Sequence, residues 1–328
     1  MRQLIADFPQ QLDLAWKNAD LTTFQTEGKE ISNLVISGLG GSGIGGKIIS
    51  QLIQDSAKVP VIINNDYTLP AFVDTKTLVV ISSYSGNTEE TVSAMNLALD
   101  KGAQVSCITS GGQVHDMAKQ HGLNAIVVPG GQPPRSQFGY SAISLIRTLV
   151  AYEIIDASVF ASAERLGGFL RDSQEQIINR ASKLADFIQG HIPIIYSETK
   201  NEGVAIRWRQ QINENSKLLC WHHVYPEMNH NELVGWESGD DRFCVLMLRS
   251  ADDHPRSVHR MNITAEIIRS KGAKVEDIQA EGSTRLEQIF DLIHLGDWLS
   301  LIVAENNDVD PVIITNIDFL KNELSKIN

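Results

Sequence analysis

Apolar residues along the chain follow two alternating patterns. Short runs rich in β-branched residues, bounded by glycine, proline or polar residues, are typical of buried strands, and longer stretches with apolar residues three and four positions apart are typical of helices. The strand-like runs are 33–37, 59–64, 78–81, 104–108, 124–128, 192–196, 218–222, 243–248 and 274–278. The helix-like stretches are 4–16, 47–53, a segment from Thr88 onward, 114–121, 142–155, 174–188, 203–215, 258–269, 286–305 and 311–324.

The order of these segments predicts the fold class. Strands that alternate with helices indicate a parallel sheet covered by helices on both faces. The same order begins again in the second half of the chain, after a boundary near residues 155–167. We therefore expect an α/β protein with two tandem three-layer domains, residues 1–155 and residues 156–328. Glycine and proline are too scattered near the boundary for a flexible linker, so the halves should pack closely.

Composition and charge narrow the function. The 328 residues are 42% hydrophobic and 21% charged, as in an ordinary globular protein. A formal net charge of −12 argues against a general nucleic-acid-binding surface. The chain starts without a secretory signal pattern, and no apolar run is long enough for a bilayer. Cys107, Cys220 and Cys244 lie in apolar runs, which indicates reduced core residues of a cytoplasmic protein.

The stretch 78–91 combines a buried strand, a turn rich in hydroxyls and a helix start. Ser83 and Ser85 lie in the turn, and Thr88 begins the helix with two glutamates in its first turn. Free N–H groups at a helix N-terminus, supplemented by hydroxyl donors, form an anion site whose natural ligand is a phosphate monoester. The alternative is a polar loop that caps its helix and binds nothing.

A glycine-rich loop follows the first predicted strand. Residues 38–46 match the dinucleotide fingerprint, and Asp66 lies about 20 residues further on, as that fingerprint requires. This pattern supports an NAD-dependent dehydrogenase as one alternative. However, Ser42 places a hydroxyl at the centre of the loop, and a second donor loop follows at residues 82–88. Two such loops favour one compact phosphate over an extended dinucleotide. A third alternative is a glycine turn that only allows tight strand–helix packing.

Three other polar positions could carry chemistry. Arg135 follows two prolines that hold it in place, so it could stabilise an oxyanion or simply pair with a surface acid. Glu214 lies between two asparagines that could orient its carboxylate as a general base, although such a glutamate is more often solvated. His230 is also flanked by asparagines, which could fix its tautomer. Cys220 and His222 lack a second ligand pair, so we expect no zinc site.

Taken together, these motifs resemble the bifunctional phosphoglucose/phosphomannose isomerase family, whose members contain two sugar isomerase (SIS) domains. The resemblance covers nearly the whole chain. It rests on Gly-Leu-Gly-Gly-Ser-Gly-Ile-Gly-Gly at 38–46, Ser-Tyr-Ser-Gly-Asn-Thr-Glu-Glu-Thr at 83–91, Pro-Pro-Arg with Phe-Gly-Tyr at 133–140, Asn-Glu-Asn-Ser-Lys at 213–217, and Pro-Glu-Met-Asn-His-Asn-Glu at 226–232. Residues 317–321 resemble the terminal lysine helix of the family.

The resemblance implies an aldose–ketose isomerase. Such an enzyme converts glucose 6-phosphate, and mannose 6-phosphate as well, into fructose 6-phosphate through a cis-enediolate. The family uses no metal and no organic cofactor. The residues that would hold the 6-phosphate of the substrate are Gly41, Ser42, Ser83, Ser85 and Thr88.

The resemblance also implies catalytic roles. Glu214 would move a proton between C2 and C1, and Arg135 would stabilise the enediolate. His230 would assist ring opening in the active site of the partner subunit, so a homodimer with a shared site is expected. Lys321 would contact the ring oxygen or a hydroxyl.

Two assignments near the C-terminus depend on the register of the last helix. Lys326 is an alternative to Lys321 as the active-site lysine. Thr315, or a neighbour, would occupy the position that admits both glucose and mannose geometry.

Three other functions remain open at this stage. A non-catalytic SIS-type sugar-phosphate regulator would keep the hydroxyl loops but would not need Glu214 or His230. The NAD-dependent dehydrogenase is the second, and an isomerase for amino or otherwise modified sugar phosphates is the third.

Overall fold

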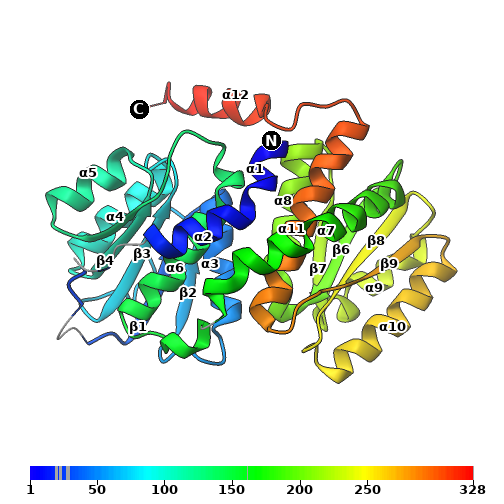
Figure 1. Ribbon diagram of the computed structural model, residues 1–328, viewed down its shortest axis with the longest axis horizontal. Helices are drawn as coiled ribbons and strands as arrows, with labels where there is room; N and C mark the ends of the chain where they lie inside the picture. The colour runs from blue at the N-terminus through cyan, green and yellow to red at the C-terminus, as the bar shows by residue number, and fades with distance from the viewer. Residues whose placement is uncertain (19–20, 22–23, 27–29, 161, 328) are drawn as a thin grey trace.

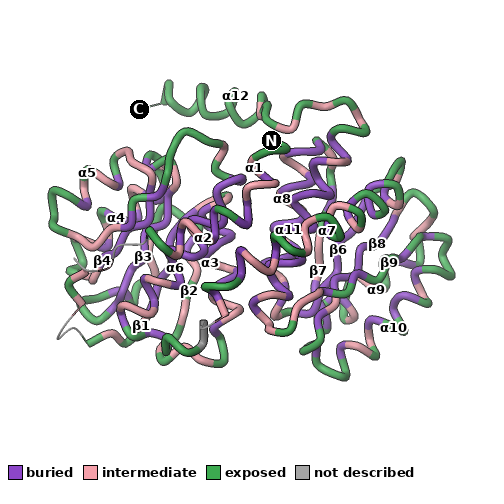
Figure 2. Tube along the Cα trace, in the orientation of Figure 1, coloured by how far each residue is buried: buried purple, intermediate pink, exposed green. Residues whose placement is uncertain are grey.

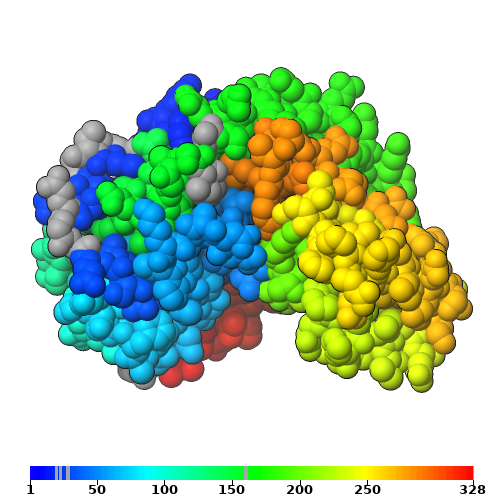
Figure 3. Space-filling model, turned by 90° about the horizontal axis from the view of Figure 1, so that it is seen from below, coloured from blue at the N-terminus to red at the C-terminus, as the bar shows by residue number. Residues whose placement is uncertain are grey.

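The computed structural model describes residues 1–327 except 19–20, 22–23, 27–29 and 161. Figure 1 shows two α/β halves side by side, each with its own sheet, and Figure 3 shows the same two lobes from below. The described residues contain a five-stranded and a four-stranded sheet. The α/β fold with two helix-covered sheets is therefore confirmed. Among the described residues, no helix has the length and apolarity that crossing a membrane would require.

The first sheet has the strand order β2-β1-β3-β4-β5, and every neighbouring pair is parallel. Its strands are β1 (Asn33–Ser37), β2 (Val61–Asn64), β3 (Thr77–Ser83), β4 (Gln104–Thr109) and β5 (Asn124–Val127). Every residue of β3 is buried, because the strand lies at the centre of the sheet between two helix layers.

Helices cover both faces of the first sheet. Leu34 and Ile36 face one layer, whereas Val35 faces the other, as the period of two in a strand requires. The first layer contains α1 (Arg2–Ala6), α2 (Phe8–Asn18), α3 (Gly40–Leu52) and α6 (Phe138–Ala151), the last after the short helix η1 (Pro134–Ser136). The second layer contains α4 (Glu89–Asp100) and α5 (Gly112–Gln120).

The second sheet has the order β7-β6-β8-β9 and is also parallel throughout. Its strands are β6 (Ile192–Glu198), β7 (Trp221–Tyr225), β8 (Phe243–Arg249) and β9 (Lys274–Gln279). One face packs against α7 (Leu166–Ile188), α8 (Glu202–Ser216) and α11 (Arg285–Asn306). The other face packs against η5 (Glu227–His230), α9 (Glu232–Gly235), η6 (Trp236–Ser238) and α10 (Pro255–Ser270). The remaining helices are η2 (Ala157–Phe160), η3 (Ala163–Arg165), η4 (Thr199–Asn201) and α12 (Thr315–Leu324).

One continuous hydrophobic core joins the two halves, as the sequence predicts. It includes Leu34 of the first sheet and Leu246 of the second. The ring of Phe8 lies 6.3 Å from that of Phe138 and 6.1 Å from that of Phe290, so aromatic residues of both halves meet. The boundary between residues 155 and 156 stays a prediction, and residue 161 within the boundary segment lies outside the described residues.

The glycine-rich stretch differs from the expected loop, because α3 already begins at Gly40 instead of residue 47. A Cβ atom at Gly43 would lie 2.4 Å from the carbonyl oxygen of Gly38, and one at Gly46 would lie 2.8 Å from a side-chain carbon of Ile36. These glycines allow the first turns of α3 to pack directly on β1. For Gly43 and Gly46, the alternative that the glycines only allow tight strand–helix packing therefore applies.

Other boundaries also differ from expectation: α7 begins at Leu166 instead of residue 174, and α6 ends at Ala151 instead of residue 155. Strand β7 begins at Trp221 instead of residue 218, because Lys217 ends α8 in a left-handed conformation and the chain needs several residues to turn back. Leu219, which was expected in the strand, is 87% exposed. Helix α12 begins at Thr315 instead of residue 311, because the carbonyl groups of Pro311 and Val312 bind a side chain of the first half instead of continuing a helix.

Candidate functional site

The strands of the first sheet all end at one edge, because they are parallel. The segments that follow β1, β3 and β5 therefore meet there, which is the usual location of ligand sites in open α/β sheets. These segments carry the glycine-rich stretch, the hydroxyl loop and the Pro-Pro-Arg segment.

The hydroxyl side chains of this edge form hydrogen bonds with one another or with the backbone. The Oγ of Ser42 accepts a hydrogen bond from the backbone N–H of Tyr84 at 3.0 Å, which joins the start of α3 to the hydroxyl loop. Ser83 donates its hydroxyl to Thr88 Oγ1 at 3.3 Å, and Ser85 Oγ accepts the N–H of Asn87 at 3.3 Å. Ser42 and Ser83 are buried, Thr88 is half-buried and Ser85 is exposed. Thr88 is the N-cap of α4, as expected.

The hydroxyl loop is held tightly against the segment after β4. Gly86 has φ +69°, and a Cβ there would lie 1.8 Å from the carbonyl oxygen of Gly111, so only glycine fits. Ser110 donates its hydroxyl to the carbonyl of Tyr84 at 2.6 Å. Burial raises the pKa of the Tyr84 phenol, which keeps this ring neutral beside the loop. The loop is therefore a rigid donor surface.

Arg135 lies at the same edge, at the junction of the two halves. The backbone of Pro134 and Arg135 lies within 3.3 Å of where a Cβ of Gly41 would be. The side chain is 5% exposed, and its Nη1 lies 3.3 Å from Oε2 of Glu214. Burial lowers the pKa of Arg135, whereas Glu214 and Asp310 raise it, and a guanidinium remains charged in this setting. Arg135 is thus a buried cation, and the alternative of a surface arginine is excluded.

Glu214 lies near the end of α8, and its side chain is 28% exposed. The flanking asparagines bind other groups. Asn213 donates to the carbonyl of Leu218 at 2.6 Å, and Asn215 accepts a hydrogen bond from Arg135 Nε at 2.8 Å. The carboxylate is therefore oriented by an arginine instead of by its neighbouring amides.

A buried ion pair next to this site also binds the backbone of Arg135. Arg207 Nη2 lies 2.6 Å from Asp297 Oδ2 and also donates to the carbonyl oxygen of Arg135 at 3.3 Å. Gln211 donates to the other oxygen of Asp297 at 2.8 Å. The sequence pattern did not indicate a functional role for these residues. The available signal was Asp297, a charged residue surrounded by apolar residues in the helical stretch 286–305, which indicates a buried carboxylate that needs a cationic partner.

His230 is not brought to Glu214 within one chain. It is exposed at the end of η5, whose Met228 packs with Tyr196 on one face of the second sheet. Trp208 of α8 packs with Ile195 on the opposite face. Because successive strand residues point to opposite faces, the sheet separates α8 from η5.

Lys321 lies on α12 and, within the described part of the chain, forms no ion pair with the other predicted residues. Every residue of α12 is exposed, as Figure 2 shows. Lys326 pairs with Glu323 at 2.6 Å. Thr315 is the first residue of α12, close in the chain to the carbonyl groups that bind Arg135. The structure thus assembles Gly41, Ser42, the hydroxyl loop, Arg135 and Glu214, but not His230 or Lys321.

The corresponding edge of the second sheet holds carboxylates of the protein itself. By strand order, β8 and α10 correspond to β3 and α4. At the start of α10, Glu198 accepts the N–H of His254 at 3.0 Å, and Asp253 accepts the N–H of Ser250 at 3.0 Å. These side chains use donors that an incoming anion would need, so the first half carries the candidate site.

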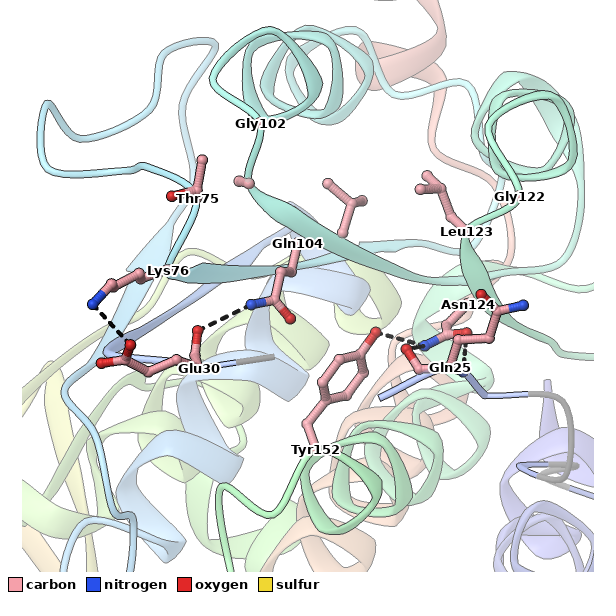
Figure 4. Close-up of a pocket in the computed structure, with 12 residues that line it drawn as sticks. Gln25, Glu30, Thr75, Lys76, Gly102, Gln104, Gly122, Leu123, Asn124 and Tyr152 are labelled. Atoms are coloured by element: carbon pink, nitrogen blue, oxygen red, sulfur yellow. Dashed lines mark hydrogen bonds and ion pairs between the residues drawn. The ribbon is translucent and has the colours of Figure 1, made fainter. Parts of the chain in front are cut away.

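A pocket of about 390 Å³ lies at the opposite edge of the first sheet (Figure 4). Its polar groups bind one another: Lys76 lies 2.8 Å from Glu30, and Asn124 donates to the hydroxyl of Tyr152 at 2.7 Å. The pocket is at the start of the strands, away from the hydroxyl loop and Glu214. We therefore assign it no ligand.

The dinucleotide and metal alternatives depend on the contacts of Asp66 and on the grouping of possible metal ligands. Asp66 uses its carboxylate to accept the N–H of Tyr67 at 2.6 Å, which is a turn contact. Among the described residues, no three His, Cys, Asp or Glu side chains are grouped as metal ligands would be. The three cysteines are buried and unpaired, and burial raises the pKa of each thiol to about 12. They are core residues, as predicted.

Two family profiles match the chain. Residues 29–145 match the SIS domain, and residues 177–324 match the bacterial phospho-glucose isomerase C-terminal SIS domain. The bifunctional phosphoglucose/phosphomannose isomerase of Caldicellulosiruptor bescii is 39% identical over 100% of this chain and 99% of its own length. The protein of the same name from Aquifex aeolicus is 36% identical over 89% of this chain and 90% of its own length. D-glucosamine-6-phosphate 4-epimerase of Sulfolobus acidocaldarius is 31% identical over 73% of this chain and 75% of its own length.

A solved structure supports the fold. The C-terminal domain of glucosamine-fructose-6-phosphate aminotransferase from Francisella tularensis superimposes with a TM-score of 0.77 at 14% identity, covering 95% of this chain and 98% of that one. At that identity the likeness concerns the fold alone.

Proposed function

This chain belongs to the bifunctional phosphoglucose/phosphomannose isomerase family, and on that premise we propose that it interconverts glucose 6-phosphate and mannose 6-phosphate with fructose 6-phosphate. The reaction proceeds by proton transfer through a cis-enediolate. The relatives' activity disfavours both the non-catalytic regulator and the NAD-dependent dehydrogenase.

The observation that carries the proposal is the contact of Arg135 with Glu214 beside the hydroxyl loop. A base and a cation lie 3.3 Å apart, and the backbone of Arg135 lies against Gly41, which precedes Ser42. The site therefore offers phosphate donors at one end and a base with an oxyanion-stabilising group at the other. An aldose–ketose isomerisation of a sugar phosphate needs these groups.

The phosphate would be held by neutral donors. Ser42 and Ser85 each accept a backbone N–H, so each keeps its own hydroxyl proton for a ligand. Thr88 accepts the hydroxyl of Ser83 and likewise keeps its proton. The N-terminus of α4 begins at Thr88, and its dipole favours a dianion at this position. Binding energy from the remote phosphate then positions C1 and C2.

Proton transfer would be the task of Glu214. Its carboxylate removes the proton from C2 of the aldose and returns it to C1, while the electron pair forms the enediolate. The C2–H group of the sugar is a very weak acid, so the negative charge that develops on the enediolate must be stabilised. Arg135 Nη1, next to the carboxylate and largely buried, supplies that stabilisation. General-base catalysis of this kind typically contributes about 10²–10⁴-fold.

The position of His230 supports a homodimer with a shared site. The second sheet separates His230 from Glu214 of the same chain, so a histidine that acts at this site must come from the partner subunit. Exposure of His230 is consistent with that role. Lys321, on exposed α12, would approach the substrate when the helix packs over the site, with Lys326 as the alternative lysine.

A panel of hexose 6-phosphates tests this function. Fructose, glucose, mannose and glucosamine 6-phosphates are each incubated in D₂O, and deuterium incorporation at C2 or C1 is measured by NMR. We expect exchange and interconversion for the first three. Exchange for glucosamine 6-phosphate alone would favour the amino-sugar alternative, and exchange for none would contradict an isomerase.

A further inference from the structure

We propose that Asn215 is a positioning residue that holds the Arg135 guanidinium for the enediolate step. The inference rests on the proposed function, because it assigns a role within the same site. Asn215 Oδ1 accepts the hydrogen bond from Arg135 Nε at 2.8 Å, and both residues are almost completely buried. Asn215 is the residue directly after Glu214 in α8. The end of this helix therefore carries both the proposed base and the group that orients Arg135.

The donors of Arg135 are distributed so that one nitrogen faces the reaction. A guanidinium carries five N–H groups in a fixed plane. Nε binds Asn215, and Nη2 donates to the carbonyl groups of Pro311 and Val312. Nη1 alone lies against Glu214, at 3.3 Å. Asn215 and the two carbonyl groups therefore fix the rotation of the plane, and Nη1 is the nitrogen presented to a substrate oxygen.

Asn215 is itself fixed by the helix α11. Its Nδ2 donates to Ser300 Oγ at 3.0 Å, and Ser300 donates to the carbonyl of Asp297 at 2.8 Å. Because the hydroxyl of Ser300 is used as a donor, it can only accept from Asn215. This arrangement orients the amide with Oδ1 toward Arg135. The main chain of Arg135 is held separately by Arg207 at 3.3 Å.

The amide also suits the chemistry better than a carboxylate would. An amide oxygen accepts the Nε–H group without neutralising the charge of the guanidinium. A carboxylate in the same place would form a close ion pair with Arg135 and weaken its attraction for the enediolate oxygen. Asparagine thus positions Arg135 while leaving its charge for the transition state.

Three variants test the role, with kcat and KM measured for fructose 6-phosphate. Asn215→Asp keeps the shape of the side chain but adds a charge, and Asn215→Ala removes the acceptor. We expect kcat to fall about 10²-fold in both, with KM changed by less than about threefold, because the phosphate loop is untouched. Asn213→Ala is the matched control, since it also removes an asparagine side chain near the same helix end, where Asn213 donates to the carbonyl of Leu218. It should keep kcat within about twofold of wild type.

The outcomes separate this inference from the proposed function. A wild-type enzyme that does not isomerise the panel substrates contradicts the function itself. An active wild type with unchanged kcat in Asn215→Asp overturns the positioning role, as does a loss that appears only in KM. If circular dichroism shows that Asn215→Ala does not fold, Ser300→Ala is tested in its place. We expect kcat of Ser300→Ala to fall about tenfold. An unchanged kcat in that variant would also overturn the positioning role.

Discussion

The Nη1 atom of Arg135 lies 3.3 Å from Oε2 of Glu214, and this contact joins the two halves of the chain. Arg135 follows the last strand of the first sheet, whereas Glu214 lies near the end of α8 in the second half. The candidate site therefore exists only where the halves meet. Its properties should depend both on the site residues and on the buried contacts that hold the halves together.

Glu214→Gln should abolish most turnover. The amide keeps the size of the side chain but cannot take up the proton of C2, so we expect kcat to fall by about 10²–10⁴-fold while KM changes little. The measurement is a coupled assay for conversion of fructose 6-phosphate to glucose 6-phosphate. Glu202→Gln is a suitable control, because Glu202 begins the same helix and pairs with Lys47 at 2.7 Å. Near-normal turnover in Glu214→Gln would contradict its role as the base.

The double variant Ser85→Ala/Thr88→Ala should weaken substrate affinity. It removes two hydroxyl donors from the predicted phosphate site, and each lost hydrogen bond to a charged group costs about 1.5–3 kcal/mol. We therefore expect KM to rise by about 10²-fold or more, with a smaller effect on kcat. Ser93→Ala, also on α4, is the control, because its hydroxyl donates to the carbonyl of Tyr67. An unchanged KM would argue against the phosphate assignment.

Mixing two inactive variants should restore activity if His230 serves the partner subunit. In a heterodimer of Glu214→Gln and His230→Ala chains, one site carries both changes and the other carries neither. Random mixing after denaturation and refolding should give about a quarter of wild-type activity. Each variant refolded alone is the control. Failure of the mixture to exceed the separate variants, although dimers form by sedimentation, would place both residues in one subunit.

Removing Asp297 should destabilise the fold more than it alters substrate binding. Asp297→Ala leaves Arg207 buried without its ion-pair partner, which typically costs about 3–5 kcal/mol in the free energy of unfolding. Urea unfolding measures this loss. The double variant Arg207→Met/Asp297→Leu should lose less, because no buried charge is left unpaired. Equal losses in the single and double variants would show that the pair itself, and not the unpaired charge, supplies the stability.

Stability should fall in acid partly because of His294. Complete burial lowers the pKa of this imidazole from 6.5 to about 3, with a smaller contribution from Arg207. The folded state therefore keeps the ring neutral, whereas the unfolded state binds a proton below about pH 6.5. Its stabilising contribution is present above that pH and is lost as the pH falls, by about 2–3 kcal/mol between pH 6 and pH 4.

Urea unfolding of wild type and His294→Gln at several pH values checks this contribution. The difference between their pH slopes isolates the histidine from the carboxyl groups that titrate in the same range. Glutamine can still accept the hydrogen bond that Trp298 donates to His294 at 3.2 Å. Parallel slopes would contradict the assignment.

The sequence by itself determined most of the strands and helices and the loops that could bind a phosphate. The run 78–81 is apolar throughout because β3 lies at the centre of a covered sheet, and Thr88 begins α4 because the chain changes there from strand to helix periodicity. The motifs also determined the family, and with it the expected chemistry. These are properties of local spacing and of residue types, which a linear sequence records directly.

The tertiary structure decided which side chains meet. It paired Arg135 with Glu214 and Asn215 across the two halves, and it placed a sheet between Glu214 and His230. It also placed the glycines after Gly40 inside a helix, because contact with β1, and not loop flexibility, requires them. Such contacts join residues far apart in the chain, and their geometry follows from how whole helices pack, which local spacing does not encode.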